Sequence, residues 1–231
     1  MGNVASSLQE SLARVRERVT TAAERAGRSP ADVTLVAVSK TFPIDVIQKV
    51  IECGAADLGE NRAQEFREKV AALGDAARWH FVGPLQTNKV RIVVGAAQLI
   101  HSVDRLQLAE AISRRAAALD IVQEVLLEVN ITGEAAKHGA EPGRAVELGV
   151  AMHGLGNLTV SGLMTMAPFS DDPETSRPYF RQLAQLRDEV AAVVPGATGL
   201  SMGMSRDFEV GIEEGATLVR VGEAIFGSRA H

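Results

Sequence analysis

The chain has 231 residues, of which 46% are hydrophobic, 23% are charged and one is a cysteine. This composition is typical of a globular protein and excludes the disordered, collagen-like and membrane-spanning classes. The net charge of −5 without a basic run argues against a nucleic-acid partner, and the single cysteine suits a reducing, cytoplasmic compartment.

The first elements are read from a change of hydrophobic period. Apolar residues recur at steps of three and four from Val4 to Val19, which predicts an N-terminal helix that ends near Gly27. Residues 33–38 then form a short β-branched run, typical of a strand buried on both faces. Pro43 opens a helical stretch that Gly54 ends, so a strand–helix unit follows the first helix.

The same strand–helix unit recurs along the rest of the chain. Strands are expected at 33–38, 57–59, 79–82, 98–101, 125–130, 158–163, 199–201 and 217–221. Eight units close a (β/α)₈, or TIM, barrel, so we predict one α/β domain over 1–231 with an extra helix over 1–27 packed on the barrel. A doubly wound sheet is the alternative, although no Gly-x-Gly-x-x-Gly follows the first strand.

Lys40 is the most informative polar residue at the carboxyl ends of the predicted strands. It ends an apolar strand, where its amine would face the barrel mouth. Burial lowers the pKa of an ammonium group, and a neutral amine can form a Schiff base with a carbonyl compound. The alternative is a lysine paired with Glu60 of the next strand.

A second group of residues follows the last two strands. Residues 201–205 and 221–223 occupy the usual phosphate site of a barrel, where glycines allow close approach, Ser205 offers a hydroxyl and backbone amides attract an anion. The glycines could also serve only as turn residues. A Schiff-base lysine facing a phosphate site predicts a phosphorylated carbonyl ligand.

Six segments spread over essentially the whole chain resemble the motifs of one family, the pyridoxal phosphate homeostasis proteins. They are AVSKT at 37–41, GENR at 59–62, WHFVGPLQTNK at 79–89, GLMTMA at 162–167, LSMGMSRD at 200–207 and RVGEAIFG at 220–227. The resemblance implies the barrel of the alanine racemase N-terminal domain, called PLP fold type III. It also implies reversible binding of pyridoxal 5'-phosphate (PLP) and a part in intracellular vitamin B6 homeostasis and supply.

The resemblance also implies roles for individual residues. Lys40 corresponds to the lysine that holds PLP covalently as an internal aldimine. Ser205, with the amides of Gly222 and Glu223, corresponds to the phosphate clamp. These assignments come from the matched motifs, and they agree with what the residue types offer chemically.

Further matched positions lie near the cofactor ring. Arg220 corresponds to the arginine that faces the pyridine nitrogen; because an arginine keeps its charge, it disfavours a proton there and makes the ring a weak electron sink. Asn61 and His80 match positions near the ring without an assigned role. The methionines at 164, 166, 202 and 204 either line the ring or fill the core.

The sequence favours a carrier over an enzyme. A racemase of this fold needs a second acid/base, which a tyrosine of an extra domain supplies in alanine racemases, whereas Tyr179 is expected on the outer helices and the chain is expected to end after its eighth unit. We therefore assign no catalytic residue and no metal, and expect a monomer that passes PLP to PLP-dependent apoenzymes. The alternatives are a racemase using Lys40 and His80, and a Schiff-base sugar-phosphate aldolase using Lys40 and Glu60.

Overall fold

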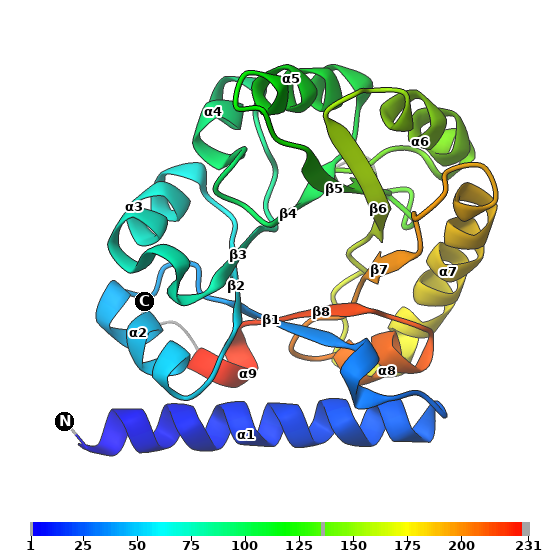
Figure 1. The fold of residues 1–231 in the computed structure, drawn as a ribbon. Helices are drawn as coiled ribbons and strands as arrows, with labels where there is room; N and C mark the ends of the chain where they lie inside the picture. The colour runs from blue at the N-terminus through cyan, green and yellow to red at the C-terminus, as the bar shows by residue number, and fades with distance from the viewer. Residues whose placement is uncertain (1, 135–136, 228–231) are drawn as a thin grey trace.

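Eight short parallel strands close into a barrel in the order β1 to β8 (Figure 1). The computed structural model describes residues 2–134 and 137–227, so both ends of the predicted 1–231 domain lie outside the described residues. The strands are β1 Thr34–Val38, β2 Asp57–Glu60, β3 Arg78–Phe81, β4 Leu99–Val103, β5 Gln123–Glu128, β6 Leu158–Met164, β7 Gly199–Ser201 and β8 Leu218–Val221. Pairing of β1 with β8 closes the ring, which confirms the predicted barrel and excludes the doubly wound sheet.

The helices form an outer ring around the strands (Figure 1). They are α2 Ile44–Glu52, α3 Ala63–Leu73, α4 Val90–Val93, α5 Leu106–Ala117, α6 Ala145–His153, α7 Arg177–Ala191, α8 Phe208–Glu213 and α9 Glu223–Phe226. Each helix turns an apolar face toward the sheet, as Phe66 of α3 and Phe180 of α7 do, and both of these rings are fully buried. The main core therefore lies between the barrel and its helices.

The first helix, α1 Gly2–Arg25, lies outside this ring and packs across α2, α8 and α9 (Figure 1). The apolar stripe predicted from the sequence is the buried face: Leu8, Leu12, Val15 and Val19 are all at most 6% exposed. The helix ends just before Gly27, whose φ of +67° is a conformation that favours glycine.

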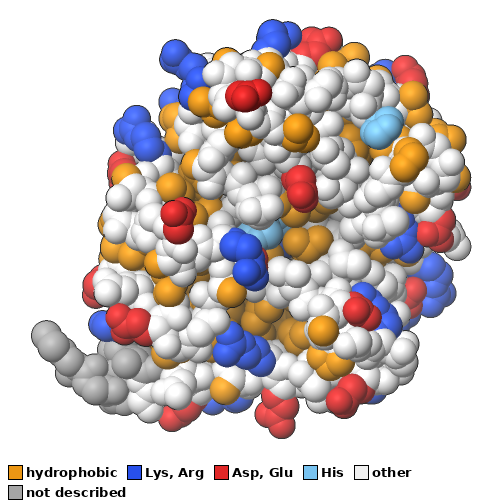
Figure 2. All heavy atoms as spheres, in the orientation of Figure 1, with side chains coloured by type: hydrophobic (Ala, Val, Ile, Leu, Met, Phe, Trp, Pro, Cys, Tyr) orange, Lys and Arg blue, Asp and Glu red, His pale blue; other side chains and the backbone are white. Residues whose placement is uncertain are grey.

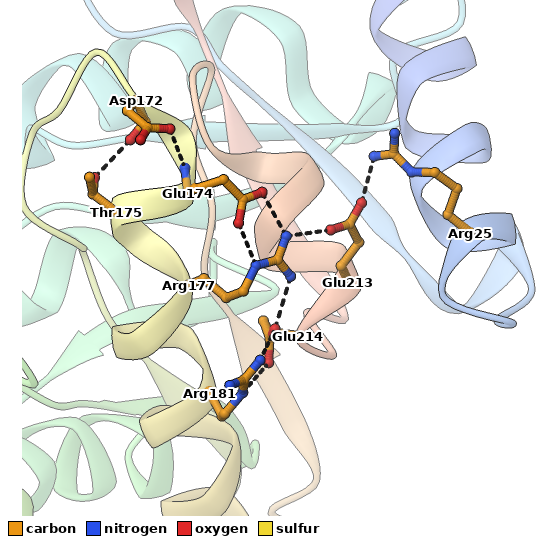
Figure 3. Close-up of polar contacts among 8 residues, drawn as sticks. All are labelled: Arg25, Asp172, Glu174, Thr175, Arg177, Arg181, Glu213 and Glu214. Carbon is orange, nitrogen blue, oxygen red and sulfur yellow. Dashed lines mark hydrogen bonds and ion pairs between the residues drawn. The ribbon is translucent and has the colours of Figure 1, made fainter.

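A network of ion pairs joins α1, α8 and the start of α7 (Figure 3). Arg177 donates hydrogen bonds to Glu174, Glu213 and Glu214, and Glu213 also accepts from Arg25 of α1 at 2.5 Å. Single exposed pairs contribute little to stability, but carboxylates shared between arginines hold the three helices in one arrangement. The network therefore helps to fix α1 on the barrel.

Charged side chains of both signs are scattered over the face drawn in Figure 2. Lys and Arg lie between Asp and Glu there rather than in one patch, so this face has no strong field of one sign. In the described parts of the chain, no helix is both long enough and apolar enough to span a membrane.

Candidate functional site

A cavity of about 420 Å³ opens at the carboxyl ends of the strands. This size is typical of a small-molecule site. Residues that follow β1, β2, β3, β6, β7 and β8 line it. Six of the seven residues predicted to contact a cofactor are among them: Lys40, Asn61, Ser205, Arg220, Gly222 and Glu223.

Lys40 lies in a tight turn that directly follows β1. The amide N–H of Phe42 donates to the carbonyl of Ser39 at 3.1 Å, and Thr41 has a φ of +69°, which is rare for a β-branched residue. Glu65 Oε2 of α3 accepts from the Thr41 amide at 2.8 Å and so holds this strained backbone in place. These hydrogen bonds hold the backbone of the turn in place, and Lys40 lines the cavity from it.

A buried ion pair supports the same turn from outside the barrel. Glu60 is fully buried, and its Oε1 accepts from Lys69 Nζ and from Ser39 Oγ, both at 2.6 Å. Lys69 Nζ also donates to the carbonyl of Ser39 at 2.8 Å. Burial raises the pKa of Glu60, and the hydrogen bonds from Lys69 and Ser39 offset this only in part.

The structure gives Glu60 a cation from a helix rather than from a neighbouring strand end. The lysine bound to Glu60 is Lys69 of α3, which the sequence analysis did not single out. Glu60 is not among the residues that line the cavity, so it is poorly placed to act beside Lys40 as the aldolase alternative requires.

Backbone amides and a hydroxyl meet on the other side of the cavity. The N–H groups of Gly222 and Ala224 point at Ser205 Oγ, at 3.2 and 3.3 Å. A Cβ on Gly222 would come within 3.0 Å of the Val38 carbonyl, so the backbone passes close to β1 here. A set of amide donors around one hydroxyl suits a phosphate group.

Asp207 fixes the loop that carries Ser205. Its Oδ1 accepts from the Met204 amide at 2.7 Å and its Oδ2 accepts from Ser176 Oγ at 2.9 Å. Asp207 is 7% exposed and was missed by the sequence analysis beyond its place in a motif. An aspartate just before a predicted helix is the signal that could have identified it, since such residues often bond nearby amides.

Arg220 lies at the inner end of the cavity. Its Nη1 donates to Ser201 Oγ at 2.5 Å and its Nη2 to the carbonyl of Thr165 at 2.9 Å. Burial lowers the pKa of Arg220 to about 10, while Glu128 and Asp207 act in the opposite direction. Arg220 is therefore a cation at neutral pH, held by two buried acceptors.

Asn61 supplies an independent indication that the cavity takes a polar ligand. Its Oδ1 is buried and has no hydrogen-bond partner within residues 2–134 and 137–227. A buried amide oxygen left unpaired costs about 1–3 kcal/mol, so such a group beside a cavity fits a ligand that donates to it. Lys40, Asn61, Ser205 and Arg220 thus bring an amine, an unpaired acceptor, a hydroxyl and a cation to one cavity.

His80 lies apart from the other six predicted residues. Its Nε2 is 3.0 Å from Asp57 Oδ1 and its Nδ1 is 3.0 Å from His101 Nε2, inside the barrel. It lines a second cavity, of about 310 Å³, with residues at the amino-terminal ends of the strands such as Arg78 and Glu124. His80 is thus not among the residues that line the first cavity, and its predicted place near the ring stays a prediction.

Glu128 is a third residue that was not singled out from the sequence, after Lys69 and Asp207. It is 3% exposed at the end of β5, and burial followed by the charge of Asp104 raises the pKa of Glu128 to about 7, while Arg220 acts to lower it. A single carboxylate inside the apolar run 125–129 was the available signal. The pKa of Glu128 therefore depends on the charge of Arg220.

We expect Glu128→Gln to stabilise the protein at alkaline pH. A carboxyl whose folded pKa is raised gives stability that is present below its unfolded pKa of about 4.5 and is lost as the pH rises through about 7. Removing the charge should therefore raise the free energy of unfolding at pH 8 by up to about 3 kcal/mol. Urea unfolding at pH 4.5 and pH 8 measures this, and an equal effect at both values would contradict it.

The methionines divide between core and cavity. Met164 and Met202 are fully buried, whereas Met166 and Met204 line the cavity. Tyr179 lies on α7, in the outer ring, and packs against the core there. Within the described residues, no group of three or more His, Cys, Asp or Glu is arranged to hold a metal ion.

Comparisons with known proteins identify close relatives. Residues 11–230 match the family described as "Alanine racemase, N-terminal domain". The chain is 50% identical over 224 residues to the pyridoxal phosphate homeostasis protein of Aquifex aeolicus, covering 96% of this chain and 98% of the relative. It is 41% identical over 225 residues to the protein of the same name from Pseudomonas aeruginosa, covering 97% and 96%.

Solved structures agree with these relatives. A protein of unknown function from Bifidobacterium adolescentis superposes with a TM-score of 0.92 at 37% identity, covering 98% of this chain and 97% of that one. PipY of Synechococcus elongatus, solved with PLP bound, superposes with a TM-score of 0.83 at 33% identity, covering 95% and 100%.

Proposed function

Because this chain belongs to the pyridoxal phosphate homeostasis protein family, we propose that it binds PLP reversibly in the cavity at the carboxyl ends of its strands. Lys40 holds the aldehyde carbon as a Schiff base in this proposal. Ser205 and the amides around it hold the phosphate. The observation that carries the proposal is that an amine and an anion-binding donor set line one cavity of suitable size.

Bound PLP would supply an electrophilic carbonyl and an aromatic ring able to withdraw electrons. The protein's own residues limit that second property. Arg220 remains charged beside the position proposed for the ring nitrogen, and a nearby cation disfavours protonation of that nitrogen. The site thus binds the cofactor's reactive groups while weakening its use as an electron sink.

The same residues favour a carrier over the racemase alternative. That alternative needs a second acid/base facing Lys40 across the cavity. Among the described residues lining the cavity there is no tyrosine or histidine, since His80 lies inside the barrel and Tyr179 on α7. We propose storage and delivery of PLP to PLP-dependent apoenzymes, by a monomer in the cytoplasm.

The ultraviolet–visible spectrum of the protein loaded with PLP tests this proposal directly. We expect a band near about 420 nm that borohydride removes, leaving a phosphopyridoxyl group that peptide mapping places on Lys40. A protein that takes up no added PLP would contradict the proposal. A reducible group found only on another lysine would contradict the role of Lys40.

Ser205→Ala should weaken PLP retention. The variant loses the hydroxyl beside the proposed phosphate position, a charge-assisted hydrogen bond worth about 0.5–3 kcal/mol, or roughly a 2- to 150-fold rise in Kd. Equilibrium dialysis measures the change. Ser170→Ala is the matched control, because Ser170 lines the same cavity away from the Gly222 and Ala224 amides, and it should bind PLP as the wild type does. Equal affinities for both variants would place the phosphate elsewhere.

A further inference from the structure

A hydrogen-bonded series of buried side chains, called the relay below, runs along the barrel axis behind Arg220. It consists of Arg220, Ser201, His101, His80 and Asp57. Ser201 Oγ, which accepts from Arg220, is 2.8 Å from His101 Nδ1. His101 Nε2 is 3.0 Å from His80 Nδ1, and His80 Nε2 is 3.0 Å from Asp57 Oδ1. The five residues come from β8, β7, β4, β3 and β2, and each is at most 7% exposed.

The relay joins the two ends of the barrel. Arg220 lines the cavity at the carboxyl ends of the strands, whereas His80 and Asp57 line the one at the amino-terminal ends. Arg78, on the rim of that second cavity, also donates to Asp57, at 2.6 and 2.8 Å. The hydrogen bonds thus connect the candidate cofactor cavity with the opposite mouth.

The two ends determine the direction of every bond between them. Arg220 can only donate, and the carboxylate of Asp57 can only accept, so His80 must carry a hydrogen on Nε2. A neutral His80 then accepts at Nδ1 from the Nε2–H of His101. This leaves His101 Nδ1 as an acceptor for the Ser201 hydroxyl, whose lone pair faces Arg220.

The opposite proton arrangement does not satisfy the buried groups. A doubly protonated His80 would donate to His101 Nε2, and His101 would then donate from Nδ1 to Ser201 Oγ. Ser201 is fully buried, and its hydroxyl hydrogen would be left with no acceptor among the described residues. Only donation in the direction from Arg220 to Asp57 leaves every polar group of the relay with a hydrogen-bond partner.

Surrounding charges favour the same arrangement. Burial, aided by the charge of Arg220, lowers the pKa of His101 well below its usual range, which keeps that ring neutral. Burial acts to raise the pKa of Asp57, but hydrogen bonds from His80 and Arg78 outweigh it and lower that pKa overall. At the other end, burial lowers the pKa of Arg220, and the charges of Glu128 and Asp207 act to raise it.

We infer that Ser201, His101 and His80 are positioning residues that fix how Arg220 faces the ring nitrogen of PLP, and that Asp57, at the far mouth, sets their proton arrangement. The inference rests on the proposed function only for the ring nitrogen. Arg220 keeps one N–H bonded to Ser201 and another to Thr165, so its guanidinium plane cannot turn freely. An altered tautomer at His80 would pass along the relay and redirect the Ser201 hydroxyl toward Arg220.

Histidine tautomers in the protein without PLP test the relay by itself. Long-range proton–nitrogen NMR correlations on ¹⁵N-histidine-labelled protein, assigned with single His→Asn variants, should show Nε2–H for both His80 and His101. The amide side chain that Asp57→Asn introduces can either accept from or donate to His80 Nε2, so there the two histidines should change together, with neither ring carrying Nδ1–H while the other keeps Nε2–H. Glu124→Gln is the control. It also replaces a carboxylate by an amide at the same mouth of the barrel, but Glu124 is not part of the relay, so neither histidine tautomer should change.

The loaded protein tests the link to the cofactor. With PLP labelled at its ring nitrogen, the wild type and Glu124→Gln should show an unprotonated ring. In Ser201→Ala the resonance should move toward the protonated position, and Kd for PLP should rise about tenfold as Arg220 loses its fixed bond. In Asp57→Asn the resonance should move in proportion to the fraction of His80 that carries Nδ1–H.

Each result decides one part of the inference. An Nδ1–H tautomer at His101 in the wild type would overturn the relay. A change of tautomers in Asp57→Asn without movement of the ring nitrogen would overturn its link to Arg220. If PLP does not bind the wild type at all, the proposed function fails together with that link, while the tautomers still decide the relay.

Discussion

Lys40→Ala is expected to abolish the borohydride-reducible adduct with PLP completely. Among the described residues that line the cavity, Lys40 is the one lysine, so no other side-chain amine there can form a Schiff base. Phosphate binding through Ser205 and its neighbouring amides should persist, so weak noncovalent uptake of PLP should remain. Absorbance with borohydride reduction, followed by peptide mapping, measures both effects.

Two further variants separate the amine from its charge. Lys40→Arg keeps a cation but cannot form a Schiff base, so it should also lose the adduct. Lys89→Ala, which removes an exposed lysine after β3, should keep the adduct unchanged. Because Lys40 follows the strand and is only partly buried, Tm of Lys40→Ala should stay within about 2 °C of the wild type. A reducible adduct retained by Lys40→Ala would contradict the proposed function of this residue.

Lys69→Met should destabilise the protein strongly. It leaves Glu60 as a fully buried carboxylate without its cation, and breaking a buried pair in this way costs about 3–5 kcal/mol, or roughly 6–20 °C in Tm. The Ser39 carbonyl also loses a hydrogen bond, so the turn carrying Lys40 should loosen and PLP should dissociate faster. Calorimetry and the rate of PLP loss to an excess of apoenzyme measure the two effects.

The double variant Lys69→Met with Glu60→Gln is the control for this effect. Without a charge at either position, its stability should return to within about 2 kcal/mol of the wild type, because a neutral pair has no unpaired buried charge. A double variant as unstable as Lys69→Met would show that lost packing, rather than the charge of Glu60, explains the effect.

The stability of Lys69→Met should also depend on pH more steeply than that of the wild type. Burial raises the pKa of Glu60 already, and loss of Lys69 removes the hydrogen bond that opposes this rise. A carboxyl with a raised folded pKa binds its proton more tightly in the folded state, so the variant should gain stability as the pH falls from about 8 toward about 4.5. A pH-independent difference from the wild type would contradict this account.

Local periodicity predicted the elements because it depends only on neighbouring residues. The N-terminal helix predicted to end near Gly27 is α1, which ends at Arg25, and the strand predicted at 199–201 is β7. The largest errors fall where polar side chains are buried. β5 begins at Gln123, earlier than predicted, because this amide is buried in hydrogen bonds to Gly95 and Ala97 across the turn before β4. Periodicity cannot show that a polar residue has found such partners.

Motif positions predicted which strand carries each candidate residue but not its height along the barrel axis. Lys40, Asn61 and Arg220 line the cavity as expected, whereas His80 lies deeper, bonded to His101 and Asp57. All four positions looked equivalent in the sequence, since each is a polar residue in or just after a strand. Register between neighbouring strands decides the height, and only the closed barrel determines register.

The sequence by itself therefore determined the barrel, the family and the lysine that faces its mouth, because periodicity, strand-end position and motif type are local properties. Tertiary structure decided which charged groups are connected: Glu60 pairs with Lys69, and Arg220 is linked to Asp57 by the hydrogen bonds of Ser201, His101 and His80. The residues of this relay lie up to 100 positions apart between bonded neighbours, as Ser201 and His101 do. Barrel closure alone brings them into hydrogen-bond distance, and burial then makes each bond obligatory.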